Sequence, residues 1–122
     1  MAKRGIVVLA HGSEIPDQEE ALTQLASFLR EKSGGPVEVG FLNFQSPRIA
    51  EAVALVLAAG AEEILVAPFF LTEGFLMRKA VSLAQQAAPG VDMKIAPPLG
   101  QHPRLVDVVL DRVAEASVRQ SD

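Results

Sequence analysis

The sequence predicts an α/β fold in three layers, with a four-stranded parallel sheet and helices on both faces. Two observations carry this prediction. Short runs of β-branched and other apolar residues alternate with longer segments whose apolar residues recur at helical spacing. Two of the short runs are apolar almost throughout, which is typical of strands covered on both faces. Such alternation indicates βαβ units around a parallel sheet.

The first half of the chain provides two of these units. Residues 5–10 form an apolar first strand, and a helix follows Pro16, opens with an acidic turn and ends at residues 34–36. Residues 37–42 alternate as a second strand nearer the sheet edge. Ser46 is the expected N-cap of the second helix, with Pro47 at its first position and Gly60 at its end. The inward residues of these helices are predicted to be Leu22, Leu25, Ala26 and Leu29, then Ile49, Val53, Val56 and Leu57.

The second half repeats the pattern. Residues 64–70 are continuously apolar and predict a central third strand. A third helix begins after Gly74 and ends before the Pro-Gly pair at residues 89–90. Residues 91–96 form a fourth strand, and a turn at 97–100 leads to a last helix. The inward residues of the third helix are predicted to be Leu76, Ala80, Leu83, Ala84 and Ala87. The last helix carries Leu105, Val108, Val109 and Val113 on one side.

Length and composition limit the class of protein. We expect residues 1–122 to form a single domain, because this length and a hydrophobic content of 49% allow a core without a disulfide. A net charge of −4 argues against nucleic acid as a partner. The lack of cysteine excludes thiolate chemistry. No apolar run is long enough for a membrane span or a signal peptide, so we expect a soluble cytoplasmic protein with no membrane partner.

In an open parallel sheet, ligands bind beyond the carboxyl ends of the strands. That rule brings together four loops: residues 11–14, residues 43–46, residues 72–74 and the turn at 97–102. His11 is the most informative residue, because imidazole can bind a metal ion or act as a base near neutral pH. The alternative is a structural histidine that caps the next helix or binds a carbonyl group. His102, at the start of the last helix, is expected to be structural.

The other motifs do not indicate a phosphate-binding or nucleophilic site. Gly12 stands outside any glycine-rich phosphate-binding motif, and Ser13 lacks the nucleophile elbow, so a turn role suits Ser13 better. Leu9-Ala10, directly before His11, lack the arginine that a phosphohistidine enzyme needs to hold a phosphoryl group. Four basic residues near helix starts would suit a ligand rich in carboxylates, although each alone is also consistent with ordinary surface charge. They are Arg48, Arg78, Lys79 and Arg104.

An ordered set of short motifs covers almost the whole chain. The first strand runs into His11-Gly12-Ser13, and Phe41-Leu42 is followed by Pro47. The run at residues 67–71 leads to Gly74, and residues 98–103 read PLGQHP. With this set the chain resembles the small CbiX-type sirohydrochlorin chelatases. The segment at residues 70–79 is most similar to the second half of the longer, two-domain members.

The resemblance implies a chelatase-like, flavodoxin-like domain, often a homodimer. It implies insertion of cobalt, nickel or iron into sirohydrochlorin or a related tetrapyrrole in cobalamin or siroheme biosynthesis. The divalent metal is then a substrate, and no organic cofactor is expected. His11 matches the family's first histidine, as metal ligand and catalytic residue. Where the family usually has a second histidine and a glutamate, this chain has Leu76 and Asn43. The substrate-binding residues expected are Ser13, Asn43, Arg48, Gly74, Phe75, Leu76 and Arg78.

A single imidazole binds a divalent metal ion weakly. Glu14, Glu73 or the His11 of a second copy could complete the site. The exposed apolar surface expected against the macrocycle comprises Phe44, Phe75, Leu76 and Met77, which could also belong to the core or a dimer interface. A second hypothesis is a non-catalytic tetrapyrrole- or metal-binding protein, which Leu76 and Asn43 favour. A third, a small hydrolase or phosphotransferase, rests on fold analogy alone.

Overall fold

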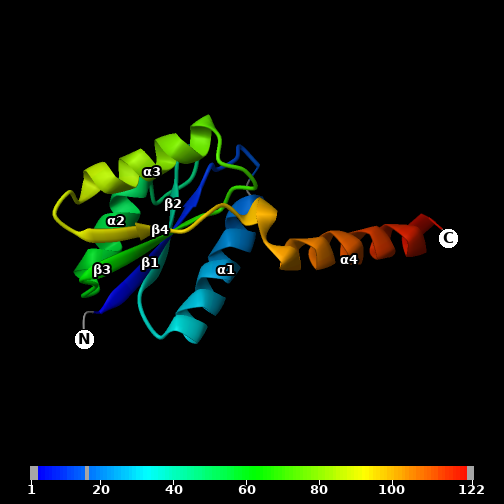
Figure 1. Cartoon of the computed structure of the whole chain (residues 1–122), viewed down its shortest axis with the longest axis horizontal. Coiled ribbons are helices and arrows are strands. Elements are labelled where there is room, and N and C mark those ends of the chain that lie inside the picture. The colour runs from blue at the N-terminus through cyan, green and yellow to red at the C-terminus, as the bar shows by residue number, and fades with distance from the viewer. Residues whose placement is uncertain (1–2, 16, 121–122) are drawn as a thin grey trace.

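The computed structural model describes residues 3–15 and 17–120 and contains a parallel sheet of order β2-β1-β3-β4. The strands are β1 (Arg4–Ala10), β2 (Val37–Phe41), β3 (Glu63–Pro68) and β4 (Asp92–Ile95). β1 pairs with both β2 and β3, so it lies inside the sheet and β2 lies at an edge (Figure 1). The predicted α/β class, the edge position of the second strand and the interior position of the third are confirmed.

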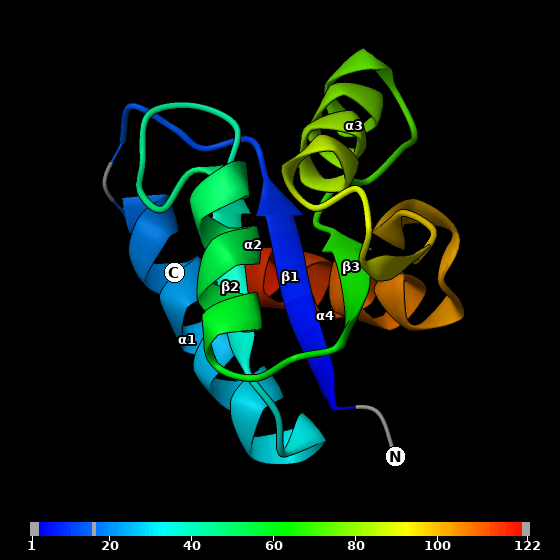
Figure 2. The same ribbon diagram turned by 90° about the vertical axis from the view of Figure 1, so that its left-hand side faces the viewer.

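Three helices pack on the sheet. α1 (Asp17–Ser33) covers one face, and α2 (Ile49–Ala58) and α3 (Phe75–Ala87) cover the other (Figure 2). The short turn η1 (Leu99–Gln101) precedes the last helix, α4 (Pro103–Gln120). Every described strand points the same way, so the loops that follow them rise at one end of the sheet.

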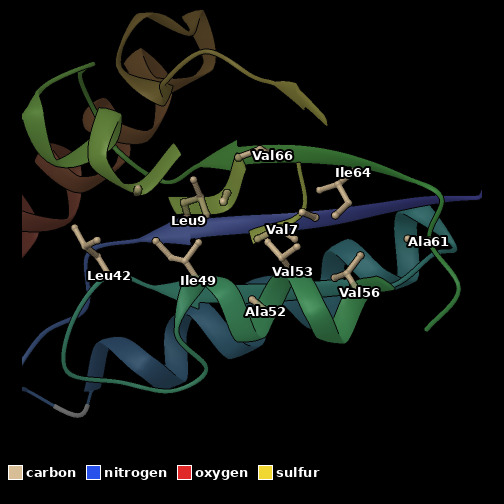
Figure 3. Packing of buried hydrophobic residues seen from close by; sticks show 13 residues of the cluster. Val7, Leu9, Leu42, Ile49, Ala52, Val53, Val56, Ala61, Ile64 and Val66 are labelled. Carbon is tan, nitrogen blue, oxygen red and sulfur yellow. The ribbon is translucent and has the colours of Figure 1, made fainter. Parts of the chain in front are cut away.

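Each face of the sheet has its own apolar cluster, because successive side chains of a strand point to opposite faces. Val7, Leu9, Ile64 and Val66 pack under α2 and α3 (Figure 3). Val8, Ala10 and the inward residues of β2 pack under α1. With about 25 cal/mol for each Å² of apolar surface removed from water, these clusters are the main source of stability.

Several boundaries differ from the sequence predictions. The third strand ends at Pro68 rather than at residue 70. The second helix begins at Ile49 with Arg48 as its N-cap, and both Ser46 and Pro47 belong to the preceding loop. The backbone N–H of Arg48 donates to Glu51 Oε1 at 3.1 Å, so the helix start is closed by a carboxylate rather than by a serine hydroxyl.

The inward face of α3 is also shifted. Met77, Ala80 and Ala84 are its buried residues, whereas Leu76, Leu83 and Ala87 are exposed, contrary to prediction. The observed set keeps the helical spacing but starts one residue later. Three small or flexible side chains on this face let α3 pack closely beside α2 and over the sheet. The sequence pattern is compatible with either set of inward residues, and packing against α2 and the sheet determines which set is buried.

α4 does not pack on the sheet. It projects from the body along the long axis of the molecule (Figure 1), and its described side chains from residue 106 to 118 are exposed. Of the four apolar residues expected on one side of this helix, Val108, Val109 and Val113 are exposed and Leu105 is partly covered. β4, at the edge of the sheet, is largely exposed. Among the described helices, none combines the length and apolarity that a bilayer crossing requires.

Candidate active site

His11 directly follows β1 and lies exposed at the carboxyl end of the sheet. The loop after β2 runs alongside it: Asn43 N–H donates to the His11 carbonyl at 2.9 Å, and Leu42 N–H donates to the Ala10 carbonyl at 2.8 Å. These bonds extend the ladder between β1 and β2 by two residues. The backbone of His11 is thereby fixed, while its imidazole stays accessible.

Gly12 makes this close approach possible. Its φ of +92° lies in the left-handed region, and a Cβ there would lie 1.9 Å from the Asn43 carbonyl oxygen. Any side chain would force the two loops apart. Gly12 therefore serves the geometry of His11 rather than a phosphate group, in line with the missing glycine-rich motif.

Gln45 joins the same two loops through its side chain. Its Oε1 accepts from Ser13 N–H at 2.8 Å, and its Nε2 donates to the Ser13 carbonyl. The Ser13 hydroxyl accepts from Ile15 N–H at 3.0 Å, which confirms the predicted turn role. Gln45 was recognised only as a loop residue, since nothing in its sequence neighbours shows that a side-chain amide will pair with a backbone across two loops.

Phe44 contacts His11 directly. The two rings meet edge to face, with centroids 6.3 Å apart and planes at 87°. Phe44 is 53% exposed and adopts a φ of +72°, which is unusual for a residue other than glycine. The loop therefore holds an aromatic ring against the imidazole at some cost in backbone strain, and that ring limits the orientations of His11.

A cavity of about 580 Å³ opens beside His11. It lies between the start of α1 and the end of β3, and apart from His11 the side chains that line it are apolar. The lining residues are Ala10, His11, Gly12, Ala21, Leu22, Leu25 and Phe69. A concave apolar surface of this size with a single polar side chain at its mouth suits a large, flat, organic ligand.

Two walls of this cavity, Phe69 and Leu25, were not predicted as ligand-facing residues. Phe69 was assigned to the third strand, but β3 ends one residue earlier and the Phe69 ring is 45% exposed. Leu25 was assigned to the core under α1, where it is only half-buried and faces the cavity. An apolar run does not reveal where a strand ends, so the exposed aromatic side chain could not be distinguished from a buried one.

The predicted residues at the start of α3 form a separate group. Gly74 is the N-cap of α3, and its carbonyl accepts from Arg78 N–H at 3.1 Å. Phe75 is 72% exposed and Leu76 is also exposed, whereas Met77 is buried. Met77 therefore belongs to the core and not to a ligand surface, which corrects that prediction. Arg78 borders a different, smaller cavity of about 220 Å³.

Two other polar predictions are also located. Arg48 is exposed as a residue, yet its Nη1 donates to the Leu42 carbonyl at 3.1 Å, so it braces the loop that carries Asn43 and Phe44. His102 accepts at Nδ1 from Arg104 N–H at 3.1 Å. This bond closes the first turn of α4 and confirms the structural role expected for His102.

The described part of the chain holds no group of three histidine, aspartate or glutamate side chains that could bind a metal ion together. Glu14 and Glu73 are exposed and do not complete such a group with His11. Among the described residues, His11 therefore has no two further imidazole or carboxylate side chains beside it with which to form a metal site.

Comparison with known proteins gives consistent matches over almost the whole chain. The model of the CbiX family matches residues 5–116. A sirohydrochlorin cobaltochelatase from Sulfurisphaera tokodaii is 31% identical over 91% of this chain and 92% of its own length. A chloroplastic sirohydrochlorin ferrochelatase from Arabidopsis thaliana is 35% identical over 89% of this chain and 51% of its own.

A solved structure agrees with the sequence matches. A crystal structure of a cobalamin (vitamin B12) biosynthesis CbiX protein from Marinobacter aquaeolei VT8 superposes with a TM-score of 0.78. It is 29% identical, and the alignment covers 95% of this chain and 98% of that one. The resemblance seen in the sequence motifs therefore extends to the arrangement of strands and helices.

Proposed function

This chain belongs to the CbiX family, and on that premise we propose that it is a sirohydrochlorin chelatase, an enzyme that inserts a divalent metal ion into the macrocycle. Cobalt, iron and nickel are the candidate metals, and the related proteins from Sulfurisphaera tokodaii and Arabidopsis thaliana are a cobaltochelatase and a ferrochelatase. The observation that carries the proposal is the exposed imidazole of His11 at the mouth of an apolar cavity.

The reaction exchanges two protons for one metal ion. A divalent cation loses its water ligands, binds the macrocycle's ring nitrogens and displaces two N–H protons, so the net charge is conserved. A protein can assist by holding the partly dehydrated cation near the ring and by accepting a proton. A neutral imidazole can do both in turn, since its ring nitrogen is a metal ligand and a base.

The small number of protein donors suits this role. A site with many strong ligands would retain the ion, whereas the macrocycle must remove it. His11 alone holds the cation weakly, and the ring nitrogens supply the donors that the protein does not. A His11 from a second copy could add a donor on the opposite side of the ring.

The macrocycle would lie against the apolar wall beside His11, which includes Phe69 and Leu25. Phe44, Phe75 and Leu76 add exposed apolar surface. Ser13, Asn43 and Gly74 belong to loops or helix starts at the carboxyl end of the strands, where backbone groups can meet the substrate's polar edge. Arg48 and Arg78 are the cations that we assign to its carboxylates.

The setting we propose is that of a cytoplasmic lyase in tetrapyrrole biosynthesis. Residues 1–122 act as one domain, and two copies form a homodimer. The only small molecules required are the metal ion and the tetrapyrrole, without an organic cofactor. The net charge of −4 argues against nucleic acid as a partner.

The direct test is anaerobic incubation of the protein with sirohydrochlorin and Co²⁺, Ni²⁺ or Fe²⁺, followed by absorbance of the macrocycle. Faster conversion to the metallated spectrum than in protein-free samples is the expected result. A saturable spectral shift without insertion would instead identify a tetrapyrrole-binding protein. Absence of both responses would contradict the proposal.

A further inference from the structure

The orientation of the His11 imidazole depends on packing. A histidine that binds a metal ion usually donates its second ring N–H to a carboxylate or a carbonyl group, and this bond fixes the ring. In the part of the chain that the structure describes, the imidazole of His11 forms no hydrogen bond, and the ring of Phe44 meets it edge to face. The direction of the imidazole therefore depends on how firmly Phe44 is held.

Phe44 stands at the centre of a strained turn. Gln45 N–H donates to the Asn43 carbonyl at 2.9 Å, and the φ of Phe44 between them is +72°. A hydrogen bond from residue i+2 back to residue i, around a φ of about +75°, defines the rarer and strained form of the γ-turn. Phe44 is exposed, so burial of its ring offsets little of the strain. Such a turn persists only where the surrounding structure restrains it.

The side chain of Gln45 supplies that restraint at the far end of the turn. Its Oε1 accepts from Ser13 N–H at 2.8 Å, and its Nε2 donates to the Ser13 carbonyl. The amide also packs on Gly12, where a Cβ would lie 2.9 Å from Gln45 Oε1. Gln45 thereby ties the residue that ends the γ-turn to the backbone only two residues beyond His11.

Backbone bonds hold the rest of the loop. Asn43 N–H donates to the His11 carbonyl at 2.9 Å, just before the turn. Phe41 N–H donates to the Pro47 carbonyl at 2.9 Å and closes the base of the loop. Between Asn43 and Pro47, the hydrogen bonds that reach the loop of His11 come from the Gln45 side chain. This side chain therefore decides whether the turn stays closed around Phe44.

From these contacts we infer that Gln45 is a positioning residue for metal insertion. Its amide keeps the γ-turn closed, the turn holds Phe44 against His11, and the contact of the two rings sets the direction of the imidazole. The kinetic consequence rests on the proposed function, whereas the contacts themselves do not. Both ends of the amide face Ser13, so Gln45 acts through its neighbours and makes no contact with the macrocycle.

The chemistry of the two bonds requires an amide at this position. An amide offers a carbonyl acceptor and an N–H donor, and the Ser13 backbone needs one of each. In Gln45→Glu the carboxylate accepts from Ser13 N–H but has no hydrogen to donate, so its second oxygen repels the Ser13 carbonyl. Gln45→Met keeps nearly the same side-chain length and forms neither bond. Both variants should release the turn.

Steady-state kinetics separate positioning from substrate binding. We expect Gln45→Met and Gln45→Glu to lower kcat for metal insertion by about 3–10-fold, the range for loss of an aromatic contact, with the KM for sirohydrochlorin unchanged. Gln86→Met is the matched control, because it also removes a side-chain bond, from Nε2 to Ser82 Oγ at 3.0 Å, on the exposed side of α3. It should keep the wild-type kcat. An unchanged kcat in both Gln45 variants, or a change confined to KM, would overturn the inference.

A double variant tests whether Gln45 acts through Phe44. Phe44→Gly removes the ring and relieves the positive φ, so there is nothing left for the amide to hold. Adding Gln45→Met to Phe44→Gly should then lower kcat no further. Two losses that multiply would mean that the residues act independently, and would contradict the route through the ring.

The imidazole can also be observed directly in the protein without metal or substrate. The chain has two histidines, so NMR signals of the His102 ring serve as an internal reference for those of His11. In Gln45→Met the His11 signals should move to their positions in Phe44→Gly, while those of His102 stay in place. Unmoved His11 signals would overturn the inference. A wild type that inserts no metal would contradict the proposed function, and these signals would then decide alone whether Gln45 holds the ring.

Discussion

The imidazole of His11 and the ring of Phe44 meet edge to face, at a centroid distance of 6.3 Å. These residues lie 33 positions apart and come from the loops after β1 and β2. Phe44 keeps a positive φ of 72° to make this contact. Such a conformation is unfavourable for a residue with a Cβ. The position of the ring therefore lowers the free energy of unfolding.

Two substitutions of Phe44 separate the ring from the strain. Phe44→Ala and Phe44→Gly both remove the contact with His11, which is worth about 0.5–1.5 kcal/mol in aromatic pairs. We expect both to lower kcat/KM for metal insertion by about 3–10-fold. Only glycine relieves the positive φ, so Phe44→Gly should be about 1 kcal/mol more stable than Phe44→Ala in urea unfolding. Wild-type turnover in both variants would show that the ring does not orient His11.

Gly12 offers a test of the close approach between the two loops. Gly12→Ala should cost about 2–4 kcal/mol of unfolding free energy, because the new Cβ would meet the Asn43 carbonyl at a positive φ. Gly90→Ala is the matched control, since nothing lies within 4 Å of a Cβ there. Its unfolding free energy should stay within about 1 kcal/mol of the wild type. Equal effects of the two substitutions would mean that the loops can separate freely.

The strands were largely predictable from sequence, and the ligand cavity was not. Continuous apolar runs located β1 and β3 because residues buried on both faces leave no alternation. The helix phase of α3 and the end of β3 were missed, since Leu76 and Phe69 are as apolar as their buried neighbours. Whether such a side chain packs inward depends on which element lies opposite, and that information is not local in the sequence.

The same dependence on distant elements explains why the position of α4 was not predicted. Its apolar residues predicted a helix with one apolar side, which is present, but the contacts of Leu99 with Phe70 and of Gly100 with Leu71 direct the helix away from the sheet. His11 was identified correctly as the residue at the end of the first strand, because the rule for parallel sheets needs only chain order. The contact of Phe44 with His11 and the bonds of Gln45 to Ser13 depend on the path of a second loop.

The cavity beside His11 can be filled without disturbing the core. Ala21 is exposed on the first turns of α1 and lines the cavity, so Ala21→Phe should occupy space meant for the macrocycle. We expect the KM for sirohydrochlorin to rise about tenfold or more, as for other lost pocket contacts. Ala54→Phe, at an exposed position on α2, should leave the KM unchanged. An unchanged KM in Ala21→Phe would place the substrate elsewhere.

The central claim is that His11 contacts the metal ion during insertion, and the chain has a second histidine for comparison. The decisive measurement is the rate of Co²⁺ insertion into sirohydrochlorin by His11→Ala beside His102→Asn, in which asparagine can still accept from the Arg104 N–H. We expect a loss of about 10²–10³-fold for His11→Ala and wild-type turnover for His102→Asn. Full activity in a folded His11→Ala variant would contradict the account.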